Sequence, residues 1–144
     1  MNAIAGKRVV VTRAAHQSEE LACPLRELGA RVILLPAIEI VPPADPGPLN
    51  RVATQIEQYD WIVFSSVNAV SSVASCLGSA SRPRARIAVI GDATRRAVEE
   101  LGWSVDVVPG RFVAESLIEA IPTQELRGRR LLLPTPAVTR NVIP

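Results

Sequence analysis

The hydrophobic pattern is clearest in residues 60–70, which read DWIVFSSVNAV. Residues 61–65 are apolar or small without alternation, as expected for a strand that is buried on both faces. The strand ends at Ser65 and Ser66, and the small and branched apolar residues after Asn68 recur with helical spacing. The stretch therefore predicts a buried strand, a hydroxyl-rich turn and the start of a helix.

The same unit of strand, polar turn and helix recurs along the chain. Apolar runs predict further strands at residues 7–13, 31–35, 86–90, 105–108 and 129–133. Amphipathic spacing predicts helices at residues 18–28, 49–58, 68–77, 94–101 and 114–121, with a loop at 122–127. Right-handed crossovers between such units produce parallel sheets covered by helices, so the pattern predicts an α/β fold.

The helix predicted at residues 18–28 carries both a start signal and a breaker. Ser18 is a suitable N-cap, and three leucines share one helical face (Leu21, Leu25 and Leu28). Pro24 would lie inside this helix, so we expect a kink or a later start.

A proline-flanked segment interrupts the alternation of strands and helices. Residues 36–43 predict a linker or an edge strand, because proline cannot donate to a central ladder. We expect a first domain that contributes only residues 1–35, a linker strand at 36–42 and a second domain at 43–144.

The composition excludes several classes of protein. A net charge of +2 is too small to indicate nucleic-acid binding. No apolar run approaches the roughly 18 residues of a membrane span, and no signal peptide is recognisable, so we expect a cytoplasmic protein that does not bind membranes. Cys23 and Cys76 are far apart and indicate free buried thiols, with no metal site.

Arginine supplies almost all of the positive charge, with 15 arginines and one lysine. The planar guanidinium binds carboxylates bidentately, which suits an acidic ligand. The alternative is a coding sequence that favours arginine generally.

The predicted strand ends carry hydroxyls, glycines and arginines, but no histidine, cysteine or carboxylate pair. Because ligands bind at the carboxyl ends of parallel strands, this set indicates an anion-binding surface with little provision for acid–base catalysis. Neither GxxxxGK[ST] nor GxGxxG is present, which argues against the common nucleotide sites.

Structural explanations remain open for most of these residues. Ser66 or Asn68 could simply cap the following helix, and Asp92 is better explained as a capping residue than as a base. Thr94 fits equally a first-turn position and a ligand contact. His16 fits a solvated loop.

The order of several short motifs resembles the uroporphyrinogen-III synthase family. The motifs are TR at 12–13, LPxIxI at 35–40, DWIVFSSxNAV at 60–70, IAVIGxAT at 87–94, VPxxFxAExL at 108–117 and GxxLLLP at 128–134. The resemblance implies two flavodoxin-like domains joined by a two-stranded linker, with the first domain built from both chain ends. Family members are longer, so this chain is expected to stop within the second domain.

The resemblance also implies an activity: cyclisation of the linear tetrapyrrole hydroxymethylbilane, with loss of water, inversion of the last pyrrole ring and no metal or organic cofactor. By position it implies a catalytic Thr94 and a substrate-binding set of Arg13, Ser65, Ser66, Asn68, Gly91, Ala93 and Phe112. A family tyrosine would lie beyond Pro144. We expect a monomer, with a segment-exchanged dimer as an alternative, and a non-catalytic module that binds a polyanionic small molecule as the competing function.

Overall fold

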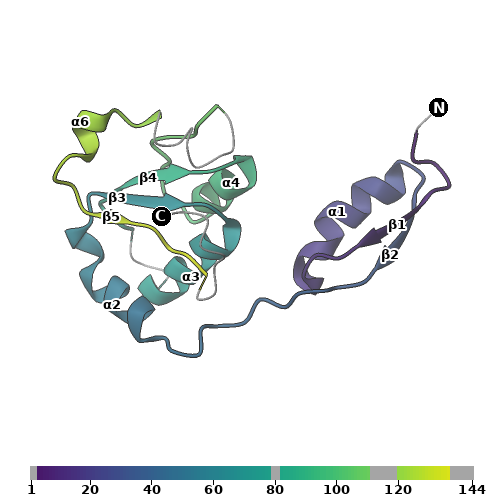
Figure 1. Cartoon of the computed structure of the whole chain (residues 1–144), viewed down its shortest axis with the longest axis horizontal. Helices are drawn as coiled ribbons and strands as arrows, with labels where there is room; N and C mark the ends of the chain where they lie inside the picture. Colours follow the sequence, from purple (N-terminus) through teal and green to yellow (C-terminus); the bar gives the residue numbers. More distant parts are fainter. Residues whose placement is uncertain (1–2, 79–81, 111–119, 137–144) are drawn as a thin grey trace. The chain divides into compact units, whose positions relative to one another are not determined.

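The computed structural model describes residues 3–78, 82–110 and 120–136 of the 144-residue chain (Figure 1). The chain divides into two compact units, Met1–Pro43 (unit 1) and Ala44–Pro144 (unit 2). Both units combine parallel strands with helices, which confirms the predicted α/β class.

Unit 1 is a single strand–helix–strand element. Strand β1 (Arg8–Val11) pairs in parallel with β2 (Arg31–Leu34), and helix α1 (Ala15–Glu27) connects them. Both strands and the helix lie where the hydrophobic pattern predicts them, except that α1 begins three residues early. Leu35 N–H donates to the Val11 carbonyl (2.9 Å), which extends the pairing towards the linker.

The predicted role of Ser18 as an N-cap is wrong. Ser18 lies inside α1 and is fully buried, and its hydroxyl donates to the carbonyls of Ala14 (3.0 Å) and Arg13 (3.1 Å). The chain also continues as a helix through Pro24, without the later start that the proline suggested. Ser18 therefore holds the turn between β1 and α1 from within the helix.

Helix α1 packs on its sheet through small residues. Ser18 and Ala22 are its buried residues, whereas Leu21 and Leu28 are 42% and 44% exposed. The predicted leucine face is thus only partly covered. Cys23, which was expected to be buried, is also exposed on this helix. The other face of the sheet is also open, because the paired residues Val10 and Ile33 remain about half exposed (51% and 47%).

Unit 2 is built on a parallel sheet in the order β4–β3–β5. The strands are β3 (Trp61–Phe64), β4 (Arg86–Val89) and β5 (Leu131–Leu132), and an isolated parallel bridge joins Ala88 of β4 to Val107. Every residue of β3 is buried, as the unbroken apolar run predicts. The segment 105–108 contributes this bridge instead of the full strand that the pattern predicts.

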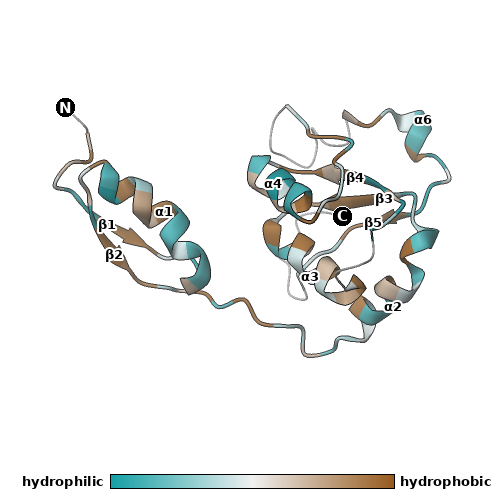
Figure 2. Cartoon of the chain, turned by 180° about the vertical axis from the view of Figure 1, so that it is seen from behind, coloured by the Kyte–Doolittle hydropathy of each residue, from teal (hydrophilic) through white to brown (hydrophobic). Residues whose placement is uncertain are grey.

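The side chains of β3 alternate between two hydrophobic clusters. Ile62 and Phe64 face one cluster, which includes Val70 of α3 (Val67–Leu77) and Val98 of α4 (Asp92–Glu100). Trp61 and Val63 face the second cluster, together with Ala88 and Ile121. This two-residue period arises because successive side chains of a strand point to opposite faces. Figure 2 shows the hydrophobic (brown) colouring of the central strand β3.

The remaining helices of unit 2 differ in detail from the prediction. Helix α2 (Gly47–Gln55) and the 3-10 turn η1 (Ile56–Gln58) together occupy the predicted helix. The predicted loop 122–127 contains the short helix α6 (Thr123–Leu126), which is a correction. The predicted helix at 114–121 falls largely outside the described residues.

Candidate functional site

The turns after β3 and β4 lie next to each other. The two strands pair in register up to Phe64 and Val89, and Ile90 N–H donates to the Phe64 carbonyl (2.9 Å). The following turns therefore begin at one edge of the sheet, here called the carboxyl edge. The structure thus brings Ser65, Ser66 and Gly91 together, as the motif positions predict.

The turn after β3 presents two exposed hydroxyls. Ser65 and Ser66 are both exposed, and Ser66 is the N-cap of α3, with its hydroxyl oxygen accepting from Ala69 N–H (3.2 Å). The capping explanation for Ser66 is therefore correct, while its own O–H remains a donor. Asn68, the second residue of α3, is half-buried.

The turn after β4 depends on a glycine conformation. Gly91 is the N-cap of α4 with φ 89° and ψ 154°, a combination that is essentially restricted to glycine. Asp92 and Ala93 follow as exposed helical residues, so α4 begins two residues earlier than predicted. Asp92 is thus the first helical residue and not the cap.

Thr94 is buried, with only 4% of its surface exposed. It lies in the first turn of α4, as its sequence position predicts. Little of the surface of Thr94 is therefore open to a ligand.

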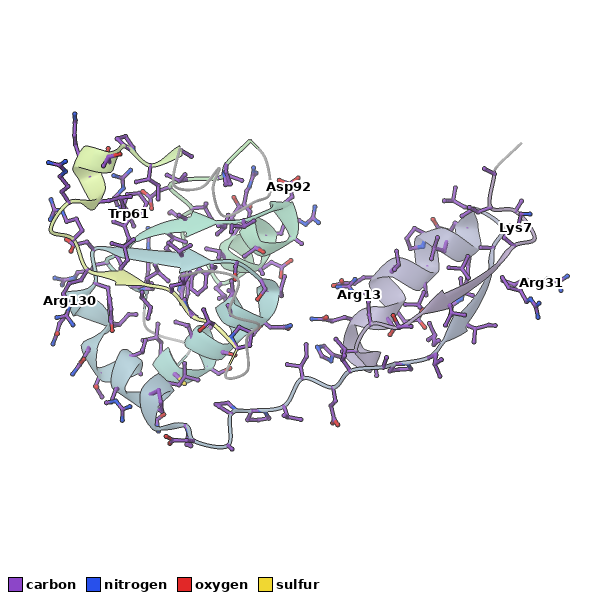
Figure 3. The ribbon with its side chains drawn as sticks, viewed as in Figure 1. Lys7, Arg13, Arg31, Trp61, Asp92 and Arg130 are labelled. Atoms are coloured by element: carbon purple, nitrogen blue, oxygen red, sulfur yellow. The ribbon has the colours of Figure 1, made fainter. Side chains whose placement is uncertain are left out.

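The two helix starts differ in charge. The first turn of α3 contains no acidic residue, whereas that of α4 contains Asp92 (labelled in Figure 3). Free backbone amides at a helix start favour an anion, and a carboxylate already present there opposes one. The α3 side of the carboxyl edge is therefore the more favourable place for an acidic ligand.

Arg13 lies in unit 1, at the junction of β1 and α1 (Figure 3). Its guanidinium forms an ion pair with Glu20 of α1 (Arg13 Nη1 to Glu20 Oε2, 3.2 Å), with the two side chains 42% and 71% exposed. Such exposed pairs contribute little free energy, so another carboxylate could replace Glu20. His16, expected in a loop, is the second residue of α1 and is exposed. Phe112 lies outside the described residues.

The opposite edge of the unit 2 sheet, here called the amino edge, collects arginines that the sequence reasoning did not single out. Arg86 stacks on Trp61 (4.3 Å from guanidinium carbon to ring centre) and pairs with Asp106 and Glu125. Two open hollows of about 330 and 400 Å³ lie here. The ion pairs of Arg86 connect β4 to α6 through Glu125 and to the segment near Val107 through Asp106, which indicates a structural role.

Asp60 anchors the start of β5 at the amino edge. Its carboxylate accepts from the Arg130 backbone N–H (2.9 Å) and from Arg129 Nη1 (2.9 Å). These two interactions, the Arg130 N–H first, lower the pKa of Asp60 below its ordinary value of 3.8. The pair of contacts holds the last strand beside β3, where Trp61 aligns with Leu131.

The described residues contain no group of three or more histidine, cysteine or acidic side chains that could hold a metal ion. None of the helices in the same ranges is long and apolar enough to cross a membrane. The carboxyl edge presents the hydroxyls of Ser65 and Ser66, the backbone amides at two helix starts and the carboxylate of Asp92.

Comparisons with known proteins give the family. Residues 19–144 match the family model described as uroporphyrinogen-III synthase HemD. The chain is 39% identical over 133 residues to the uroporphyrinogen-III synthase of Synechococcus elongatus, covering 90% of this chain and 50% of the relative. It is 30% identical over 140 residues to the putative uroporphyrinogen-III synthase of Methanocaldococcus jannaschii, covering 94% and 56%.

A solved structure, the uroporphyrinogen III synthase of Thermus thermophilus, matches with a TM-score of 0.53 and 20% identity over 94% of this chain and 54% of that one. At this identity the likeness concerns the fold alone. The chain spans about half the length of the relatives that it matches.

Proposed function

The chain belongs to the uroporphyrinogen-III synthase family, and from this premise we propose that it takes part in tetrapyrrole biosynthesis as the synthase itself. The proposed reaction converts hydroxymethylbilane to uroporphyrinogen III in the cytoplasm, without a cofactor and with the chain as a monomer. The observation that carries the proposal is the family match over residues 19–144, together with the hydroxyl-rich carboxyl edge where Ser65 and Gly91 begin adjacent turns.

The proposed reaction needs few catalytic side chains from the protein. The carbon–oxygen bond of the hydroxymethyl group breaks, the hydroxyl takes up a proton and leaves as water, and the methylene carbon left behind becomes an electrophile. The α-carbon of the last ring that already carries the bridge to the third ring forms a carbon–carbon bond with this methylene. The older bond to the bridge carbon then breaks, and the bridge carbon bonds to the other α-carbon of the last ring, which loses a proton. The electron-rich pyrroles drive these reaction steps. The protein's task is to hold the last ring so that its substituted α-carbon, and not its free α-carbon, meets the methylene carbon, which is catalysis by orientation.

In this proposal, Thr94 is the catalytic residue, whose hydroxyl hydrogen-bonds the tetrapyrrole in its reacting conformer. Its burial supports a single, closely fitted contact instead of a solvated one. The remaining proposed contacts bind the substrate's carboxylates and orient its rings: Arg13, Ser65, Ser66, Asn68, Gly91, Ala93 and Phe112.

The test is isomer analysis after incubating the 144-residue chain with hydroxymethylbilane. The products are oxidised to porphyrins and separated by chromatography. The proposal predicts type III isomer in excess, because spontaneous closure without the protein gives type I. Thr94→Val keeps the buried volume and removes the hydroxyl, and we expect it to lower type III formation by at least about tenfold, with Thr94→Ser retaining activity.

Type I product alone would contradict the proposal. In that case, binding of uroporphyrin by the chain would favour the alternative, a non-catalytic module for a polyanionic small molecule. Absence of both type III product and uroporphyrin binding would rule out both functions for this chain.

A further inference from the structure

The order of the parallel strands in unit 2 reverses beside β3. From β3 the chain moves to β4 and then to the bridge at Val107 on one side, and it returns to place β5 on the other side. In open parallel sheets, ligands bind outside the carboxyl ends of the strands at such a reversal. The topology therefore extends the binding crevice to the ends of β3 and β5, beside the adjacent turns after β3 and β4.

The register aligns two hydroxyl residues at this reversal. Trp61 pairs with Leu131 and Ile62 with Leu132, so counting onward aligns Ser65 with Thr135. The pairing of β5 ends at Leu132, and Pro134 has no N–H with which to extend the ladder. Residues 133–136 thus continue past β5 without further strand pairing.

The surroundings of these two residues favour an anion. Ser65 and Thr135 are both exposed, and the adjoining start of α3 has no acidic residue in its first turn. Asp92 lies on the β4 side of the same edge, where its charge opposes a carboxylate. Two hydroxyl donors and the first amides of α3 form a set suited to one carboxylate group.

We infer that Thr135 is a further substrate-binding residue, which shares one carboxylate of the tetrapyrrole with Ser65. This inference rests on the proposed function and adds to it a residue after β5. It also gives the β3–β5 boundary a role in orienting the substrate, whereas Gly91 and Thr94 act from the β4 side.

The test is a fluorescence titration of the chain with uroporphyrin III, which carries acetate and propionate groups on every ring. Thr135→Val removes the hydroxyl but keeps the branched shape, and we expect binding to weaken by about three- to tenfold. Thr135→Ser retains the hydroxyl and is expected to bind as the wild type does. The matched control is Thr123→Val, because Thr123 begins α6, whose Glu125 pairs with Arg86 at the amino edge.

A double variant tests whether the two hydroxyls share one group. If they do, the loss in Ser65→Ala combined with Thr135→Val is smaller than the sum of the two single losses. Additive losses would refute the shared carboxylate.

Equal affinity of Thr135→Val and Thr123→Val, in a wild-type chain that binds uroporphyrin and forms the type III isomer, would refute the inference alone. A wild-type chain that neither binds uroporphyrin nor forms the type III isomer would refute the proposed function, and this inference with it.

Discussion

Replacing Gly91 by alanine tests whether the turn at the carboxyl edge depends on its backbone conformation. At φ 89° and ψ 154°, a residue with a Cβ is strained by about 1–3 kcal/mol. Taking about 2 kcal/mol and a urea dependence of about 2 kcal/mol per molar, the unfolding midpoint should fall by about 1 M urea. The same strain displaces the first turn of α4, so we also expect weaker binding of uroporphyrin.

Tryptophan fluorescence is the appropriate readout for this variant. The chain contains two tryptophans, Trp61 and Trp103, and both are buried in unit 2 (2% and 7% exposed). Their emission therefore reports the unfolding of the unit that contains Gly91, with no contribution from unit 1.

Two other glycines provide controls. Gly110 has no left-handed φ and no atom within 4 Å of an added Cβ, so its alanine variant should be neutral or slightly more stable. Gly102 has φ 75° and open space around it, so alanine there should cost about 1–2 kcal/mol through conformation alone. If the free energy of unfolding of Gly91→Ala matches that of Gly110→Ala within about 0.5 kcal/mol, the argument from backbone strain is wrong.

Three further variants probe the core and the ion pairs. Phe64→Ala deletes a fully buried ring and should destabilise unit 2 by about 3–5 kcal/mol, measured by the same urea unfolding; a loss below about 1 kcal/mol would contradict the assigned core. Asp60→Asn should destabilise the chain at neutral pH. Because the folded state lowers the pKa of Asp60, the difference in stability between wild type and variant should persist above about pH 4 and disappear as the pH falls below 3.8. A pH-independent difference in urea midpoints would refute that cause. Glu20→Gln removes the ion-pair partner of Arg13, so uroporphyrin binding should tighten while the free energy of unfolding changes by less than about 1 kcal/mol. The control Glu19→Gln removes the partner of Arg26 and should leave uroporphyrin binding unchanged.

Local sequence patterns were sufficient to predict a strand or a helix end where one chemical tendency dominates. The unbroken apolar run of β3 predicts a strand buried on both faces, and Gly78 closes α3 as expected. Helix boundaries were less predictable. Ser18 has the chemistry of an N-cap, yet it lies inside α1, because two carbonyls of the preceding turn accept its buried hydroxyl.

The amino-edge contacts could not be predicted, because they join residues far apart in sequence. Asp60 meets Arg129 and the Arg130 N–H across about seventy positions, and Arg86 meets Glu125. Sequence shows that these groups are charged, but not which of the many arginines is nearest to which carboxylate.

The order of residues along the chain determined the α/β class, the positions of most strands and helices, and the hydroxyl-rich turns, because periodicity and turn chemistry act over a few neighbouring residues. Only the tertiary structure decided that β5 lies beside β3 opposite β4, that Ile62 pairs with Leu132, and that Thr94 is buried. Strand order depends on long-range packing of whole elements on both faces of the sheet, and many orders are compatible with the same local pattern.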